Sequence, residues 1–387
     1  MPNTKLLDDT CKTKNLLALD AGTGLTSIVD ILNREGKEKL DYLKSSFLLE
    51  LYPNTFNVNN ASKDNCSREG DVKDNENDNQ VVKESIHHYI DTSNLDIKLP
   101  FYGLGEIQSE LTNYQITNKI LNAIDGYFIT HSHMDHISSL IINSPAFRSP
   151  KCIYGLHPTI DSIRKNLFNG SVWPDFVSMG IVNLTTMKPQ ISYDDICERY
   201  SIKAFEVSHG ECSFENDSDS AGRYPSTAFL ITDNKFDYNM LFFGDVESDH
   251  SSNCHYNSKI WETISPLIIN DRLSSIVIEC STVDMPPPLY GHMSPTNLVY
   301  EMLALRKHCV DYANGNDRET YGANDEYYRM QDMQPLDGLN VIVIHVKETV
   351  DKVNPRYLIL RQLKLANEQH NLKIHYSIAL SGLSLIV

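Results

Sequence analysis

The chain has 387 residues, of which 41% are hydrophobic, and a formal net charge of −17. This length allows one large domain or two, and the acidic balance argues against a nucleic acid polymer as partner, because such binding draws on many Lys and Arg contacts to phosphates. No apolar run reaches the ~18 residues of a transmembrane helix, and no secretory signal pattern opens the chain. Eight scattered cysteines lack disulfide or zinc-site spacing. We therefore expect a cytoplasmic protein that does not bind a membrane.

The N-terminal part predicts a buried strand over residues 15–20, which ends in Asp20 and precedes a glycine-containing turn and a helix at 25–33. Residues 57–84 are rich in Asn, Asp, Lys and Ser and nearly free of large apolar side chains. They cannot bury enough surface to offset the entropy of ordering, so we expect a disordered insertion. Apolar residues at helical spacing predict a helix within 104–125.

The most informative stretch is residues 131–136, His-Ser-His-Met-Asp-His, at the end of an apolar, strand-like run. Neutral imidazole is the commonest metal ligand, and Asp is almost never buried unpaired, so packing explains this stretch poorly. At a strand end, His131 and His133 point the same way because side chains alternate. The following turn then directs Asp135 and His136 toward a second point nearby. The pattern predicts two adjacent metals, each with two ligands from this loop.

In the second half, several predicted strands also end in a potential metal ligand or acid. These strands cover residues 202–208, 240–243, 275–279 and 339–344, and the polar side chains at their ends are His209, Asp245, Glu279 and His345. Active sites of layered α/β folds lie at strand ends, where loops converge. A lone histidine after a strand is more often structural, but the recurrence favours one shared site.

Residues 131–145, HSHMDHISSLIINSP, resemble the signature of the class II cyclic nucleotide phosphodiesterases, the fungal low-affinity cyclic AMP enzymes of the metallo-β-lactamase superfamily. Met134 replaces the usual Leu, which conserves volume and apolarity. The resemblance implies an α/β fold, an αββα four-layer sandwich, built as a single domain over 1–387 with the insertion at about 57–84 and a polar loop at about 311–336. Relatives carry a further N-terminal strand, for which this chain leaves little room.

The resemblance also implies which residues hold two divalent ions, most simply zinc. One ion would be held by His131, His133 and His209, the other by Asp135, His136 and His345, with Asp245 bridging the two. Asp20 would not bind a metal but would support the metal-binding loop, residues 131–136, by contacting its ligands. Nitrogen and oxygen ligands suit zinc and leave manganese and iron open.

His292 has two interpretations, because its Gly-His-Met-Ser-Pro setting suits either the last metal ligand or a proton donor. We favour His345 as the ligand, since it directly ends a buried strand. His292 then resembles the proton-donor histidine of the related phosphodiesterases and ribonuclease Z, and Glu279 is a plausible carboxylate partner for it.

The implied reaction is hydrolysis of 3′,5′-cyclic nucleotides, cyclic AMP and also cyclic GMP, to nucleoside 5′-monophosphates, which ends cyclic nucleotide signalling. A hydroxide shared by the metals, beside Asp135, would attack phosphorus. Thr227 would help to bind the phosphoryl oxygens, and His292 would contact the substrate and protonate the leaving 3′ oxygen. The expected partner is this small molecule; the base preference and the oligomeric state, a homodimer included, stay open.

Three alternatives also stay open. A ribonuclease Z-like endonuclease for transfer RNA 3′ ends uses the same ligands but normally has a basic arm, which this sequence lacks. A thioesterase or lactonase of the superfamily would not require the signature through Pro145. A scaffold that has lost its metals is disfavoured, because all seven ligands are present.

Overall fold

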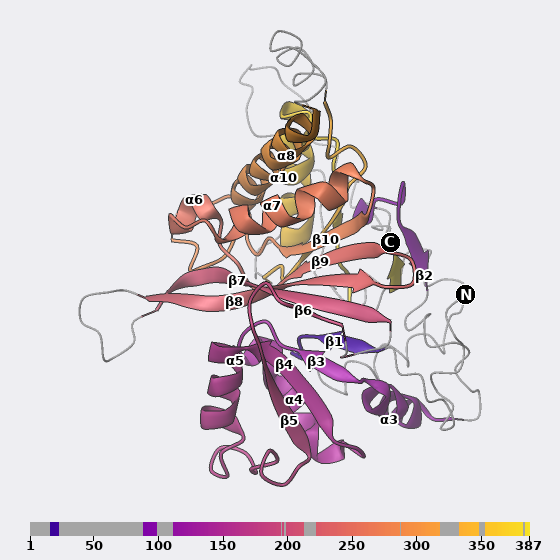
Figure 1. The fold of residues 1–387 in the computed structure, drawn as a ribbon, viewed down its shortest axis with the longest axis vertical. Coiled ribbons are helices and arrows are strands. Elements are labelled where there is room, and N and C mark those ends of the chain that lie inside the picture. The colour runs from indigo at the N-terminus through magenta and orange to yellow at the C-terminus, as the bar shows by residue number, and fades with distance from the viewer. Residues whose placement is uncertain are drawn as a thin grey trace, which may run out of the picture.

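The computed structural model describes residues 16–22, 88–98, 111–194, 196, 199–212, 222–286, 288–317, 333–347, 353–381 and 384–387. The expected helix at 25–33 and the expected insertion at 57–84 lie outside these residues. Two sheets face each other in the middle of the molecule, and helices cover the outer face of each (Figure 1).

The smaller sheet is entirely parallel and has the order β1-β3-β4-β5. Its strands are β1 (Leu17–Leu19), β3 (Gly126–Phe128), β4 (Lys151–Leu156) and β5 (Val182–Met187). Parallel strands need crossover connections, and these include α3 (Asn113–Ala123), α4 (Met134–Asn143) and α5 (His157–Ser162), which continues as the π-helix Ile163–Leu167. A capping box between Thr112 and Gln115 fixes the start of α3. The part of the expected 104–125 helix that precedes residue 111 is outside the described chain.

The larger sheet has the order β12-β11-β10-β9-β8-β7-β6. Its first four strands in sequence pair antiparallel and its last four parallel. The strands are β6 (Ser192–Tyr193), β7 (Tyr200–Cys212), β8 (Gly222–Asp233), β9 (Tyr238–Phe243), β10 (Leu273–Glu279), β11 (Asn340–Ile344) and β12 (His375–Ile378). The C-terminal β13 (Ser384–Ile386) pairs with β2 (Asp96–Lys98).

In the described part of the chain, the helices that accompany the larger sheet are α6 (Asp249–Ser252), α7 (Tyr256–Ile269), α8 (Pro295–Asp317) and α10 (Pro355–Gln369). In Figure 1 they lie above the sheet, on the side away from β1 and β3. Helix α8 continues to Asp317, past the point where the polar loop at 311–336 was expected to begin. No helix in the described residues is long and apolar enough to cross a membrane.

The alternation of side chains along the strands builds separate apolar layers. In β3, Tyr127 packs toward α4, while Phe128 belongs to the cluster between the sheets. In β8, Leu230 packs on the helix side, while Phe229 and Ile231 face the smaller sheet. Both sheets are therefore buried on both faces, and the expected αββα sandwich is confirmed.

Candidate metal centre and active site

The strand ends of both sheets converge on one cluster of polar side chains. From the smaller sheet, β3 leads into His131; from the larger, β9 leads into Asp245, β10 ends at Glu279 and β11 leads into His345. His345 has a φ of +58°, which is rare for a residue other than glycine. The left-handed backbone turns the chain sharply as it leaves β11, at the point where the side chain enters the cluster.

His209 arrives by a different route from the one expected, because it lies inside β7 and not after it. The pairing of β7 with β8 shifts register between Ser208 and Glu211, and Gly210 has a φ of +83°. Such a bulge re-aims the side chain next to it. The strand thus continues while His209 turns into the cluster.

Three histidines form the first group: His131, His133 and His209. Their ring centroids lie 4.6 to 5.0 Å apart, and one nitrogen of each lies within 4.8 Å of the others. The Nδ1 of His209 donates to the Gly291 carbonyl at 2.8 Å. The Nδ1 of His131 lies 3.0 Å from the Thr130 hydroxyl. Because these Nδ1 atoms are held by the protein, the Nε2 atoms are the ones directed into the group, where His209 Nε2 lies 3.3 Å from His133 Nδ1.

The second group contains Asp135, His136, Asp245 and His345, again with ligating atoms within 4.8 Å of one another. The Nδ1 of His136 lies 2.8 Å from Asp20, and the Nδ1 of His345 lies 3.0 Å from the Ser281 hydroxyl. Each imidazole is again anchored through Nδ1 with Nε2 directed into the group.

Asp245 lies between the two groups and turns one oxygen to each. Its Oδ2 is 3.9 Å from His131 Nε2 and 3.6 Å from His209 Nε2. Its Oδ1 is 3.3 Å from His136 Nε2 and 3.5 Å from His345 Nε2. The carboxylate is 2% exposed. This geometry fits a residue shared by two ions.

The hydrogen bonding of the cluster is incomplete without cations. The Nε2 atoms of His131 and His136 and the Oδ1 of Asp245 are buried and have no hydrogen-bond partner. Buried polar atoms are normally satisfied, so each such exception calls for an explanation. Burial, reinforced by neighbouring histidines, lowers the pKa of His131 to about 2, and burial also lowers the pKa values of His133 and His209. Neutral imidazoles are the form that binds metals, so the residues fit two divalent ions.

Asp20 contacts the loop of residues 131–136 and the residue before it, as the sequence led us to expect. It accepts hydrogen bonds from the backbone N–H and the hydroxyl of Thr130, both at 2.8 Å, besides its contact with His136. Burial alone would lower the pKa of His136, but the hydrogen bond to Asp20 and the negative charges of Asp20 and Asp245 outweigh it and raise that pKa to about 10. Gly22 passes so close to the Asp135 carbonyl that no Cβ fits there. Asp20 thus orients His136 directly and His131 through Thr130.

His292 and Glu279 lie together at the edge of the cluster, as the sequence predicted. The His292 Nδ1 is 3.0 Å from Glu279 Oε1, and Glu279 also accepts from the Val246 N–H and the Ser281 hydroxyl. The His292 Nε2 is 2.7 Å from Lys347 Nζ. His292 also lies within 4.8 Å of ligating atoms of other cluster residues. Since both of its nitrogens face protein groups, it suits a metal less well than His345 does.

This arrangement has counterparts among known proteins. The family model of the class-II cAMP phosphodiesterases matches residues 54–382. The chain belongs to this family. The family resemblance predicted from residues 131–145 is therefore confirmed.

Individual relatives of this class-II chain agree. A 3′,5′-cyclic-nucleotide phosphodiesterase of Candida albicans is 31% identical over 96% of this chain and 90% of its own length. Another, from Schizosaccharomyces pombe, is 33% identical over 67% of this chain and 68% of its own length. The crystal structure of unliganded yeast PDE1 matches with a TM-score of 0.72 and 27% identity, and covers 97% of this chain and 93% of that one.

One expected substrate contact does not agree with the structure of this family member. Thr227 lies on β8 and is fully buried, and its hydroxyl donates to the Thr130 carbonyl at 2.7 Å. A hydroxyl that is used in this way cannot reach a phosphoryl oxygen. Thr227 instead joins the larger sheet to the metal loop of the smaller one, and its expected role in substrate binding was wrong.

Sequence reasoning missed several residues that support the cluster. Glu247 accepts hydrogen bonds from the Ser208 hydroxyl, the Gly210 N–H and Arg223, at 2.6 to 3.1 Å. It therefore fixes the bulge that aims His209. Tyr224 stacks on His133 with a centroid distance of 4.5 Å and an interplanar angle of 20°. Lys347 was missed as well. Glu247 and Lys347 each follow a predicted site residue, Asp245 and His345, by two positions. This spacing was the one signal in the sequence that pointed to them.

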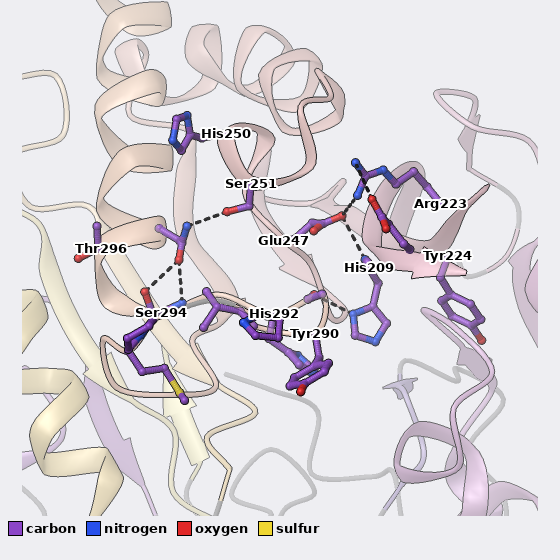
Figure 2. Close-up of a pocket in the computed structure, with 18 of the residues that line it drawn as sticks. His209, Arg223, Tyr224, Glu247, His250, Ser251, Tyr290, His292, Ser294 and Thr296 are labelled. Atoms are coloured by element: carbon purple, nitrogen blue, oxygen red, sulfur yellow. Dashed lines mark hydrogen bonds and ion pairs between the residues drawn. The ribbon is translucent and has the colours of Figure 1, made fainter. Parts of the chain in front are cut away.

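A cavity of about 1200 Å³ opens beside the cluster (Figure 2). His133, His209 and His292 of the cluster line it, and so do Tyr290 and Arg223. A substrate whose reacting group lies at the cluster would extend into this space. The phosphodiesterase thus has room for a nucleoside next to the place where metals would bind.

Proposed function

We propose that the protein hydrolyses 3′,5′-cyclic AMP, and also cyclic GMP, to nucleoside 5′-monophosphates at the two groups of ligands joined by Asp245. The position of Asp245, with one oxygen toward each group, carries this proposal. Family membership supports the substrate class. The size of the cavity supports both nucleotides, since it is larger than the ~300–1,000 Å³ of common ligand pockets.

His131, His133 and His209 would hold one ion, and Asp135, His136 and His345 the other, with Asp245 shared. Zinc is our proposal for both because the ligands are nitrogen and oxygen atoms. When bound, the ions would supply an activated water and positive charge for the phosphoryl oxygens.

Side chains of the protein would supply the proton that the leaving group needs. Glu279 accepts from Nδ1 of His292 and so places any further proton on Nε2, which faces Lys347. Burial opposes protonation of His292, but the hydrogen bond and charge of Glu279 outweigh it and raise the pKa of His292. We propose that this imidazolium protonates the departing 3′ oxygen. Lys347 is exposed and can exchange its contact with Nε2 for one with the substrate.

The experiment compares His292→Gln with His345→Gln. The His292 variant should keep two ions per chain and lose about 10²–10⁴-fold in turnover of cyclic AMP. It should lose far less with bis-nitrophenyl phosphate, because nitrophenolate leaves without a proton. The His345 variant should fall toward one ion per chain and lose activity on both substrates. Loss of an ion from the His292 variant, or an equal loss on both substrates with both ions bound, would refute the assignment.

Pocket charge separates this proposal from RNA cleavage. The cavity lining contains Arg223 but also the carboxylates of Glu211, Glu247 and Asp284. A polyanion would be repelled by such a wall, whereas a single cyclic phosphate needs positive charge at the cluster alone. We expect no binding of transfer RNA precursors at 0.15 M salt.

We also propose that the enzyme acts in the cytoplasm and forms a homodimer. The described cysteines Cys152, Cys254, Cys280 and Cys309 are all free thiols, which suits a reducing compartment. Sedimentation equilibrium of the full chain would test the dimer, and a single species at 44.0 kDa would exclude it.

A further inference from the structure

Tyr290 combines two unfavourable features at the rim of the cavity. Its side chain is 81% exposed, the largest exposed fraction among the exposed large hydrophobic residues of the described chain. Its φ is +52°, which is a true outlier for an aromatic residue. Exposure of an aromatic ring and a left-handed backbone each cost free energy. The left-handed backbone points to a function for this turn, and the exposed ring lies where a ligand in the cavity could reach it.

The turn that carries Tyr290 is tied closely to the metal centre. The Gly291 carbonyl accepts from His209 Nδ1 at 2.8 Å, and the His292 N–H donates to the Leu289 carbonyl at 3.2 Å. A Cβ on Gly291 would lie only 2.7 Å from the His209 backbone. The turn therefore packs directly on the β7 bulge, and the position of Tyr290 relative to the cluster is fixed.

Tyr290 differs from the other tyrosine that lines the cavity. The Tyr224 ring already stacks on His133, and its hydroxyl lies 3.1 Å from Ser132 Oγ. The side chain of Tyr290 makes no hydrogen bond, ion pair or ring contact with the part of the chain that the structure describes. Figure 2 shows the two rings on either side of His209. Tyr290 thus offers a free aromatic face beside the cluster.

The rest of the cavity suits a nucleoside. Met285, Pro286 and Leu289 form an apolar wall on the same loop as Tyr290. Other segments of the chain contribute polar groups to the lining, among them Arg223, Glu247 and Ser251. A purine has two apolar faces and a polar edge, and it can use both kinds of surface.

We propose that Tyr290 is a substrate-binding residue, on which the base of the cyclic nucleotide stacks while its phosphate lies at the metal centre. This inference rests on the proposed function and adds the residue that recognises the nucleoside. Stacking on an aromatic ring tolerates any base, since every base has a π face. The Tyr290 ring would therefore contribute affinity for both cyclic AMP and cyclic GMP.

Binding of 5′-AMP to the metal-loaded full chain, measured by calorimetry, tests whether the base stacks on Tyr290. Tyr290→Asn removes the ring and keeps a residue that tolerates positive φ, so it should fold as well as the wild type. We expect its Kd for AMP to rise about 5- to 150-fold, the equivalent of the ~1–3 kcal/mol of base stacking. Tyr290→Phe keeps the ring and should bind within about twofold of the wild type. Tyr114→Asn makes the same change at an exposed tyrosine on α3 and should have no effect.

A second readout compares cyclic AMP with methyl ribofuranoside 3′,5′-cyclic phosphate, which has no base. Tyr290→Asn should lower the ratio of kcat/KM for cyclic AMP to that for the base-free analogue by a similar factor. Wild-type affinity for AMP in Tyr290→Asn, an equal loss on both substrates, or a loss in Tyr290→Phe as large as in Tyr290→Asn would overturn the proposal. If the wild type hydrolyses neither compound, the proposed function fails, and the contrast in AMP binding still decides the role of the ring.

Discussion

The two groups of ligands share Asp245 but differ in charge and in the pKa values of their histidines. The first group, His131, His133 and His209, adds only imidazoles, and the pKa of each is lowered. The second adds the carboxylate of Asp135 and His136, whose pKa is raised to about 10. The first group is therefore ready for a cation at neutral pH, while the second holds a proton that a cation must displace. Burial lowers the pKa of both His131 and His136, but the direct contact of His136 with Asp20, together with the charge of Asp245, outweighs it. Asp20 contacts His131 only through Thr130.

Removing the shared carboxylate should have the largest effect, because it breaks both groups together. We expect Asp245→Asn to lose about 10²–10³-fold in kcat/KM, comparable to the loss of one transition-state-stabilising donor in other enzymes. Metal analysis should show that both ions are bound more weakly. Asp161→Asn removes a carboxylate from an exposed i,i+4 pair with Lys165 and should change neither quantity. Loss of only one ion from Asp245→Asn would mean that the carboxylate serves one group and does not bridge.

A smaller and unequal effect should follow from Asp20→Asn. Residues that orient metal-binding histidines typically contribute about 10–100-fold in metal affinity. Since Asp20 contacts His136 directly, the weaker of two calorimetric binding steps should lose this factor, while the other changes by less. An equal loss in both steps would show that Asp20 supports the whole loop and does not distinguish the groups.

The smallest effect concerns pH and separates the groups without mutation. His136 is protonated below about pH 10, so metal binding to the second group must release a proton. Its apparent Kd should fall about tenfold for each unit of pH between 6.5 and 8. The first group should show almost no slope there, because its histidines are already neutral. Calorimetry of the chelated protein in buffers with different ionisation enthalpies would count the protons, and equal counts for both steps would contradict the comparison.

The parts that sequence reasoning predicted well are those set by local periodicity. His131 and His133 enter the cluster because they follow a buried strand, and Asp135 and His136 because a helix begins there. The four-layer fold followed from the order of strands and from the family resemblance. These features depend on neighbours in the sequence or on a long motif.

The parts that it missed depend on register between distant strands. His209 was predicted as a site residue, but the bulge in β7 that aims its side chain was not, because no alternation of apolar residues reveals it. The alternation of side chains along β8 does not show what the Thr227 hydroxyl contacts. That depends on how the two sheets pack, which places the hydroxyl against the Thr130 carbonyl and away from substrate. Lys347 and Glu247 carry no motif, and their roles appear only when the sheet brings the segments that follow β9 and β11 close to His209 on β7 and to His292. Tyr290 could not have been distinguished from other loop tyrosines without its φ.

Whether the reaction needs both groups of ligands can be decided by returning zinc to the chelated protein, measuring turnover of cyclic AMP and identifying the product by ³¹P NMR. We expect no turnover without metal, a rise that is complete at two ions per chain, and 5′-AMP as the sole product. Full turnover at one ion per chain would contradict a site built from two groups around Asp245. Formation of 3′-AMP would show that the 5′ oxygen leaves, and would contradict the proposed path of the reaction.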